Sequence, residues 1–286
     1  MHKIEAIPLS DVRDHPERYN TNNDRTHGRP DDYFDFGLKT QTSNWVDQFH
    51  SNYRVINLTI QWLGKSADMG AITGTFPRTL TEELDEYLEQ TRDTFSGVFD
   101  GTPYFVRSDR TSLKYGVHGA GPYRDLKSII ESLVTSIPDH SPLHRDGRGS
   151  VKLYLLRWRD IDPDAEFRVF VYKGQVTAIS QQNLYTVNKS ATKDPSIISK
   201  WIDCIMKYFE RVVKHRITHI DTYTYDFAIL CTEGQQGGRQ WSPYFIEINA
   251  FGAAYSAGSA LFHWMIDHDI LCPIQQREYV CFRYTV

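Results

Sequence analysis

The sequence has few cysteines and no long apolar run. Its four cysteines are far apart and form no C-x-x-C pair, so neither a disulfide framework nor a zinc site is expected. No apolar stretch approaches the roughly 18 residues that a transmembrane helix requires, and the first residues have no signal-peptide core. We therefore expect a cytoplasmic protein with reduced thiols and no membrane partner.

The sequence also lacks a strong excess of charge of one sign. It has 32 Lys and Arg against 36 Asp and Glu, a formal net charge of −4 and a pI near 6.3, so duplex nucleic acid is not the expected partner. No Ser-His-Asp or Cys-His arrangement for covalent catalysis is recognisable, and catalytic residues stay unassigned. Hydrophobic residues make up 40% of the 286 residues, enough for one large domain or two smaller lobes.

Hydrophobic periodicity predicts a mixed chain of strands and helices. We expect strands at 53–62, 151–158, 166–172, 175–180, 227–231 and 244–248, and helices at 79–95, 123–137 and from 194 to about 213. Residues 1–50 are polar with few apolar positions, and we interpret them as an irregular segment. Residues 51–150 and 151–286 would then form two lobes.

Oxygen-bearing side chains gather at the last two predicted strands. Glu247 and Asn249 are two residues apart, which turns them to the same face if the strand continues to Asn249, and Asp226 directly precedes the strand before. Magnesium takes oxygen ligands, usually one or two carboxylates plus substrate phosphates. The three residues therefore predict a magnesium site, unless Glu247 is merely the exposed edge of a half-buried strand.

Three segments are similar to the sequence blocks of a known family. They are WRDIDPDAEFRVFV at 158–171, GQVTAISQ at 174–181, and Tyr225-Asp226 with IEINAFG at 246–252; a looser match runs from Phe105 to Lys114. On these residues the chain resembles the ATP-grasp superfamily and, within it, the cell division cycle protein 123 family, over roughly residues 50–285. The resemblance implies an α+β or α/β ATP-grasp fold, in which two lobes with mostly antiparallel sheets clamp a nucleotide. Residues 51–150 would be the N-terminal lobe with a phosphate loop, and 151–286 the C-terminal lobe with the hinge and metal ligands.

The resemblance also implies roles for individual residues in binding ATP and Mg²⁺. Arg107 and Lys114 would meet the phosphates, Arg157 and Trp158 would lie at the hinge that reads adenine, Glu166 would bind the ribose, Arg168 would meet phosphates, and Asp226, Glu247 and Asn249 would hold magnesium, with Asp226 and Asn249 also contacting the nucleotide. Simpler structural roles remain open: a surface ion pair for Glu166 and Arg168, a core aromatic for Trp158, and an ordinary surface loop for residues 108–121.

Some positions depart from the family pattern. Glu247 stands where the family has Asp, Arg107 where it has Lys, and Gln182 where it has Arg. An arginine can hold phosphate through a two-pronged fork, whereas a lysine acts as a point charge. Nucleotide binding is therefore better supported than the family's particular client.

Three functions follow as alternatives. The resemblance implies an ATP-dependent assembly chaperone whose client is a subunit of translation initiation factor 2. The second is an ATP-grasp ligase that activates a carboxylate by phosphoryl or nucleotidyl transfer and passes it to an unknown acceptor, which needs positioning more than a protein nucleophile. A third, less favoured, is an ATP-dependent enzyme acting on nucleic-acid ends, suggested by local basic charge at Lys114, Arg124 and residues 145–148.

Overall fold

The computed structural model consists of two compact units. Unit 1 combines Met1–Trp45 with Asp160–Val286, and unit 2 is Val46–Arg159. The residues that the structure describes are 1–21, 30–59, 72–137, 140–143, 150–233, 239–255, 257–275 and 278–286.

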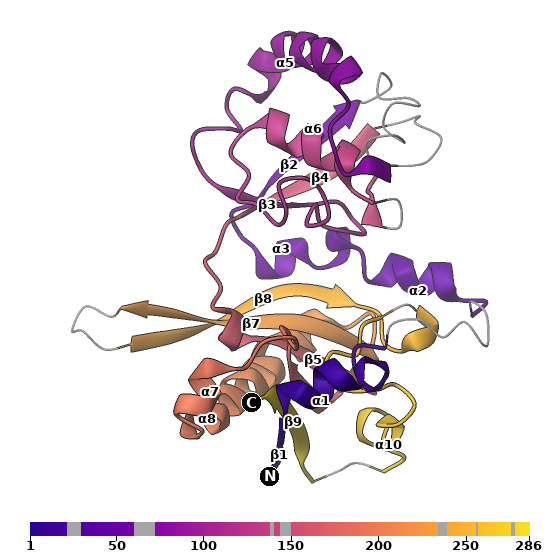
Figure 1. Cartoon of the computed structure of the whole chain (residues 1–286), viewed down its shortest axis with the longest axis vertical. Helices are drawn as coiled ribbons and strands as arrows, with labels where there is room; N and C mark the ends of the chain where they lie inside the picture. The colour runs from indigo at the N-terminus through magenta and orange to yellow at the C-terminus, as the bar shows by residue number, and fades with distance from the viewer. Residues whose placement is uncertain are drawn as a thin grey trace. The chain divides into compact units, whose positions relative to one another are not determined.

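The sheet of unit 1 has six strands in the order β1-β9-β6-β5-β7-β8 (Figure 1). β9 pairs in parallel with both β1 and β6, and the other neighbours are antiparallel. Strands β5, β7 and β8, which are neighbours in the sheet, carry most of the predicted site residues. The bounds are His2–Ile7 (β1), Glu166–Tyr172 (β5), Gln175–Gln181 (β6), Tyr223–Glu233 (β7), Arg239–Asn249 (β8) and Val280–Thr285 (β9).

Helix α8 covers one face of this sheet (Figure 1). Its buried residues Ile198, Trp201, Ile202 and Ile205 follow helical spacing, and Trp201 packs on Phe167 of β5 with ring centroids 5.2 Å apart. The predicted helix from 194 to about 213 is thus mainly α8, continued by a π-helical turn. The helical elements of unit 1 are α1 Leu9–Asp14, η1 Pro16–Arg18, α2 Tyr33–Lys39, η2 Thr42–Asn44, η5 Pro163–Ala165, α7 Lys189–Lys193, α8 Ser196–Tyr208, the π-helix η6 Phe209–Val213, α9 Lys214–Arg216, η7 Ala253–Tyr255 and α10 His268–Leu271.

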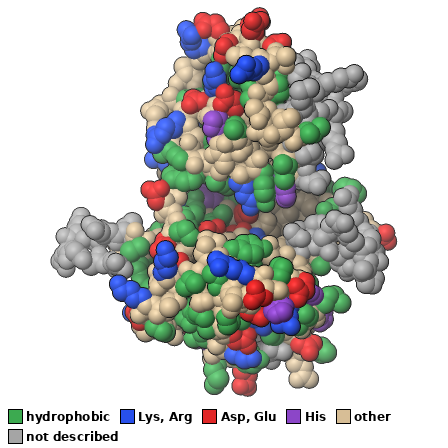
Figure 2. All heavy atoms as spheres, in the orientation of Figure 1, with side chains coloured by type: hydrophobic (Ala, Val, Ile, Leu, Met, Phe, Trp, Pro, Cys, Tyr) green, Lys and Arg blue, Asp and Glu red, His purple; other side chains and the backbone are tan. Residues whose placement is uncertain are grey.

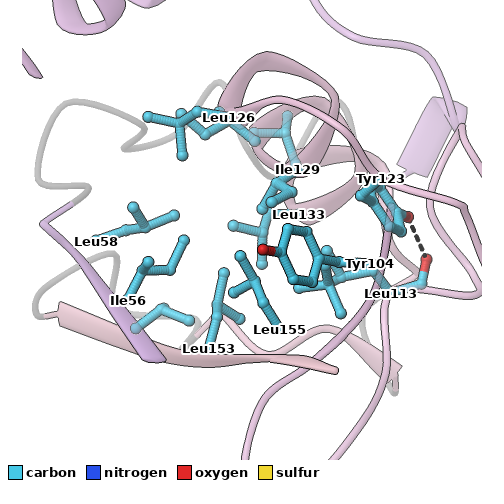
Figure 3. Close-up of a cluster of buried hydrophobic side chains, with 14 of the residues drawn as sticks. Ile56, Leu58, Tyr104, Leu113, Tyr123, Leu126, Ile129, Leu133, Leu153 and Leu155 are labelled. Atoms are coloured by element: carbon cyan, nitrogen blue, oxygen red, sulfur yellow. Dashed lines mark hydrogen bonds between the residues drawn. The ribbon is translucent and has the colours of Figure 1, made fainter. Parts of the chain in front are cut away.

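Unit 2 has a three-stranded antiparallel sheet in the order β2-β4-β3. Figure 3 shows Ile129 and Leu133 of a helix packing with Leu153 and Leu155 of the central strand, and all four are fully buried. This cluster is the core of the unit. Its elements are α3 Val46–Phe49, β2 Arg54–Thr59, η3 Arg78–Leu80, α5 Thr81–Phe95, β3 Tyr104–Arg107, α6 Leu126–Thr135 and β4 Ser150–Arg157.

Helix α6 is shorter than the predicted helix at 123–137. Tyr123 instead pairs with Tyr104, since each backbone N–H donates to the other's carbonyl at 2.8 Å. Asp125 then caps the helix by accepting from the N–H of Ser128 at 2.8 Å, which fixes the start at Leu126. Of the predicted strand 53–62, the part from residue 60 onward lies outside the described residues.

The first 50 residues are not the irregular segment that the sequence predicts. They include β1, which pairs residue by residue with β9, from His2 opposite Val280 to Ile7 opposite Thr285. β1 is an edge strand with no fully buried side chain. Its place in the sheet depends on backbone hydrogen bonds to a strand almost 280 residues away, which local sequence does not reveal.

The displayed surface and the described helices match the balanced charge of the sequence and its lack of a long apolar run. Figure 2 shows acidic and basic side chains interspersed over the displayed face. Within the described parts of the chain, no helix combines the length and the apolar character that crossing a membrane would require.

Candidate functional site

Several predicted site residues lie on neighbouring strands of unit 1. Asp226 of β7 is opposite both Arg168 of β5 and Glu247 of β8, and Thr224 is opposite Asn249. Residues opposite each other in a sheet share a face, so four side chains lie on one face of these three strands. We call Arg168, Asp226, Glu247 and Asn249 the polar row.

A β-bulge in β8 puts Glu247 on this face. Asp226 pairs with Glu247, but the next residue, Phe227, pairs with Phe245, so Ile246 has no counterpart. In an unbroken strand, residues 245 and 247 would point to the same side. The bulge separates them, as bulges near functional sites often do, and Phe245 stacks on Tyr225, with ring centroids 5.9 Å apart, on the other face.

The carboxylate of Asp226 is buried and surrounded by donors. Arg168 donates from Nε to Oδ1 and from Nη2 to Oδ2, both at 2.8 Å. Asn249 Nδ2 donates to Asp226 Oδ2 at 3.2 Å and to Glu247 Oε1 at 3.3 Å. The amide of Asn249 therefore lies between two carboxylates, and the structure brings the three predicted metal ligands together.

The polar row carries negative charge around one buried cation. Burial alone would lower the pKa of Arg168, but the carboxylate of Asp226, with help from Glu247 and Glu166, outweighs it and raises that pKa above its usual value. Glu166 lies two residues before Arg168 on β5 and so faces the same side. Three carboxylates against one guanidinium leave this face attractive to a further cation.

The donor types fit a hard divalent cation. Asp226 and Glu247 offer carboxylate oxygens, and a half-turn of the Asn249 amide would exchange its N–H for its oxygen. Among the described residues, no group of three or more His, Cys, Asp and Glu side chains is placed to hold a metal. A magnesium ion here would complete its shell with phosphate oxygens and water, as this ion commonly does.

The other predicted residues lie in unit 2. Arg107 ends β3 and is only 2% exposed, whereas Arg157 ends β4 and is exposed. Lys114 is exposed, with its ammonium 5.4 Å from the ring centroid of Tyr115. Trp158 is half-buried, and its backbone N–H donates to the carbonyl of Pro103 at 2.9 Å. The structure thus divides the predicted residues into one set in each unit.

The glycine-containing loop at 108–121 uses its backbone donors inside unit 2. Consecutive N–H groups donate to protein acceptors: Gly116 to Leu113 O at 2.9 Å, Val117 to Thr135 Oγ1 at 2.8 Å, His118 to Ser132 Oγ at 3.3 Å and Gly119 to Gly116 O at 2.9 Å. In this arrangement these four groups cannot also hold a phosphate.

Two contacts of the polar row come from residues without a predicted role there. Gln182 places Nε2 3.5 Å from Asp226 Oδ2, and its buried Oε1 has no hydrogen-bond partner among the described residues. The carbonyl of Gly258 accepts from Arg168 Nη1 at 2.8 Å. Gln182 lies two residues beyond a predicted strand, which is a weak signal, whereas the sequence around Gly258 has no periodic pattern.

Comparisons with known proteins indicate a family and a fold. The D123 family model matches residues 124–279. Cdc123 from Schizosaccharomyces pombe is similar in structure, with a TM-score of 0.51 and 13% identity over 87% of this chain and 97% of that chain. Its C-terminally truncated form gives 0.51 and 15% over 87% and 96%. A RimK domain protein ATP-grasp from Sphaerobacter thermophilus DSM 20745 aligns with a TM-score of 0.36 and 13% identity over 74% and 58%.

No curated protein sequence matches the chain significantly. The two Cdc123 structures show the fold at these identities, and the fold is the mixed α and β, Cdc123-like arrangement that the sequence predicts.

Proposed function

This chain belongs to the D123 family, and we propose that it binds ATP with magnesium at the polar row of unit 1. One observation carries the proposal: the amide of Asn249 bonds to Asp226 and to Glu247, so two carboxylates converge on one polar group. Bound magnesium would supply positive charge that neutralises the phosphates of ATP. The proposed ligands are Asp226, Glu247 and Asn249.

The remaining polar side chains would bind the nucleotide itself. We assign the ribose hydroxyls to Glu166, whose half-buried carboxylate lies on the same face as Arg168. Arg168 donates to Asp226 and Gly258 through three of its five N–H groups, so its main part is to hold Asp226, with two N–H groups left for phosphate. For Arg107, Lys114, Arg157 and Trp158 of unit 2, contact with a nucleotide stays a prediction from the sequence.

The chain would use ATP to assemble another protein rather than to make a chemical bond. The client that family membership suggests is a subunit of translation initiation factor 2. A site that binds ground-state ATP gains no rate unless it also meets the transition state and holds an acceptor in line. We therefore expect binding of Mg-ATP with negligible turnover when the partner is absent.

An ATP-grasp ligase is the second candidate, because of one specific feature. The set of two carboxylates and one amide is also what a phosphoryl-transfer enzyme needs to hold its metal ion. Release of ADP or AMP distinguishes the two functions. Steady turnover of about 1 per second, in the ordinary enzyme range, would support the ligase.

Glu247→Gln tests the binding site itself, because it removes one negative charge and keeps the shape. Calorimetric titration with ATP should show an affinity about tenfold weaker in magnesium, a loss of about 1.4 kcal/mol, and little change without magnesium. Glu210→Gln is the control, because Glu210 is exposed and pairs with Lys214 on the surface. An unchanged magnesium dependence in Glu247→Gln would contradict the proposed metal ligand.

The client is tested by capture. Immobilised protein should retain a purified subunit of translation initiation factor 2 more strongly with Mg-ATP than without nucleotide, and Glu247→Gln should lose this difference. Equal capture in both conditions would remove the assembly function while leaving ATP binding in place.

A further inference from the structure

The N-terminal segment of the chain continues from the sheet edge to the loop behind the polar row. After β1, α1 and η1, the chain reaches Asn20 and Thr21, which form hydrogen bonds with the loop at residues 257–264. We call Asn20 and Thr21 the N-terminal clamp. Both belong to unit 1, as does the loop.

Four hydrogen bonds join the clamp to this loop. The N–H of Asn20 donates to Ala260 O at 2.7 Å. The N–H of Thr21 donates to Ser259 Oγ at 2.8 Å, and the two hydroxyls lie 3.0 Å apart. The backbone N–H of Trp264 donates to Thr21 Oγ1 at 3.2 Å. A single hydroxyl, that of Thr21, therefore ties together both ends of the loop.

The same loop supports the guanidinium of Arg168. Nη1 of Arg168 donates to Gly258 O at 2.8 Å, while Nε and Nη2 hold Asp226. A Cβ added at Gly258 would lie 2.8 Å from Arg168 Nη1 and 2.8 Å from Asn20 Oδ1. Gly258 is thus packed between the clamp and the polar row, with no room for a side chain.

The backbone on both sides of this contact is held in a costly conformation. Asn20 and Ala260, which share a hydrogen bond, both have φ of 47°. An alanine in this left-handed region is strained and persists where the surroundings impose it. Such residues tend to gather at functional sites.

We propose that Asn20 and Thr21 are positioning residues of the polar row. The clamp fixes the loop, the loop fixes the carbonyl of Gly258, and this carbonyl fixes the plane of the Arg168 guanidinium that orients Asp226. The proposal rests on the proposed magnesium and ATP site and adds the N-terminal segment to it. Loss of a partner that orients a metal ligand typically costs about 10- to 100-fold in metal affinity, so a contact one step further from the ligand has a measurable effect.

Thr21→Val tests the clamp, because valine has the shape of threonine without its hydroxyl. The affinity for Mg-ATP, measured by calorimetry on folded protein, should fall about five- to tenfold, and Thr21→Ser should restore it to within about twofold. Thr192→Val is the matched control: the hydroxyl of Thr192 donates to Asn188 O at 2.7 Å in α7, also in unit 1. It should lower the melting temperature and leave the affinity unchanged.

A second readout follows Arg168 directly and needs no nucleotide. The Nε–H of Arg168, assigned by its loss in Arg168→Lys, gives a nuclear magnetic resonance signal that depends on the bond to Asp226. This signal should shift in Thr21→Val and return in Thr21→Ser, and it should stay in place in Thr192→Val.

The outcomes separate this inference from the proposed function. If the unaltered protein fails to bind Mg-ATP, the proposed function is wrong, and the Arg168 signal still decides whether the clamp positions the guanidinium. An Arg168 signal that Thr21→Val leaves unchanged would overturn the inference even if ATP binds. Should Thr21→Val not fold, Ser259→Ala removes both contacts of Thr21 with the Ser259 hydroxyl from the loop side and replaces it in both measurements.

Discussion

The polar row of unit 1 and the glycine-containing loop of unit 2 differ in which polar groups they bring together. In unit 1, side chains from three strands converge, and the buried carboxylate of Asp226 is bonded to Arg168 and Asn249. In unit 2, the backbone donors of Gly116–Gly119 bond to the loop itself and to α6. Converging charged side chains therefore indicate a site, whereas the loop uses its backbone donors within unit 2 and packs Gly116 closely against α6.

Asp226→Ala should show the largest effect on this comparison. It leaves the guanidinium of Arg168 buried without its main counter-charge, which typically costs about 3–5 kcal/mol of folding free energy. Urea denaturation followed by circular dichroism measures the loss. Asp203→Ala is the control, because the side chain of Asp203 is 58% exposed and its carboxylate lies 3.6 Å from His2 Nε2.

A double replacement sharpens the same point. Replacing both Arg168 and Asp226 by apolar residues of similar size should cost less than Asp226→Ala alone, because no charge is then left buried. A loss below about 1 kcal/mol for Asp226→Ala would mean that the pair is effectively a surface ion pair.

The strands behind the polar row could be predicted from the sequence because each carries its own periodic pattern. Spacing alone puts Glu247 and Asn249 on one face, as the register confirms. The bulge at Ile246 could not be predicted, since it depends on how β8 pairs with β7. The support from Gly258 and Asn20 was also hidden, because Gly258 lies 90 residues from Arg168 and Asn20 bonds to Ala260, still further along the chain, through backbone groups that any sequence would supply.

Glycines alone do not identify a phosphate loop, for a physical reason. Glycine suits a phosphate loop and a crowded contact equally well, since both require a backbone without a side chain. At Gly116 the crowding comes from Ser132 of α6, because an added Cβ would collide with the carbonyl oxygen of Ser132. Composition cannot tell these two uses apart.

Gly116→Ala should therefore destabilise unit 2 by about 2–3 kcal/mol, because a methyl group cannot enter without moving the backbone of α6. Gly97→Ala is the matched control, since nothing lies within 4 Å of its added Cβ, and it should change stability by less than about 0.5 kcal/mol. Thermal unfolding of both variants measures the difference. Equal stabilities would show that the loop is loosely packed and leave its donors available to a ligand.

The smallest expected effect concerns His50, which shows how unit 2 buries a titratable group. Burial, together with the positive charges of Arg107 and Arg159, lowers the pKa of His50 to about 4. In the unfolded chain a histidine has a pKa of about 6.5. Between these values the unfolded chain binds a proton that the folded chain does not, so stability is full above about pH 6.5 and is lost as the pH falls towards 4.

We expect this loss to be on the order of 1–2 kcal/mol, less than the full shift would give, because the imidazole is only partly buried. The measurement is the unfolding free energy from pH 7.5 to 4 for the unaltered protein and for His50→Gln. Subtracting one curve from the other cancels the contribution of the carboxylates, which titrate in both proteins. Parallel curves would contradict the prediction. Arg159→Gln removes one of the two nearby positive charges and should raise the pKa of His50, which narrows the pH window. Unit 2 thus favours the neutral form of His50, which it buries near cations. Unit 1 keeps the charge of Asp226 because Arg168 compensates it.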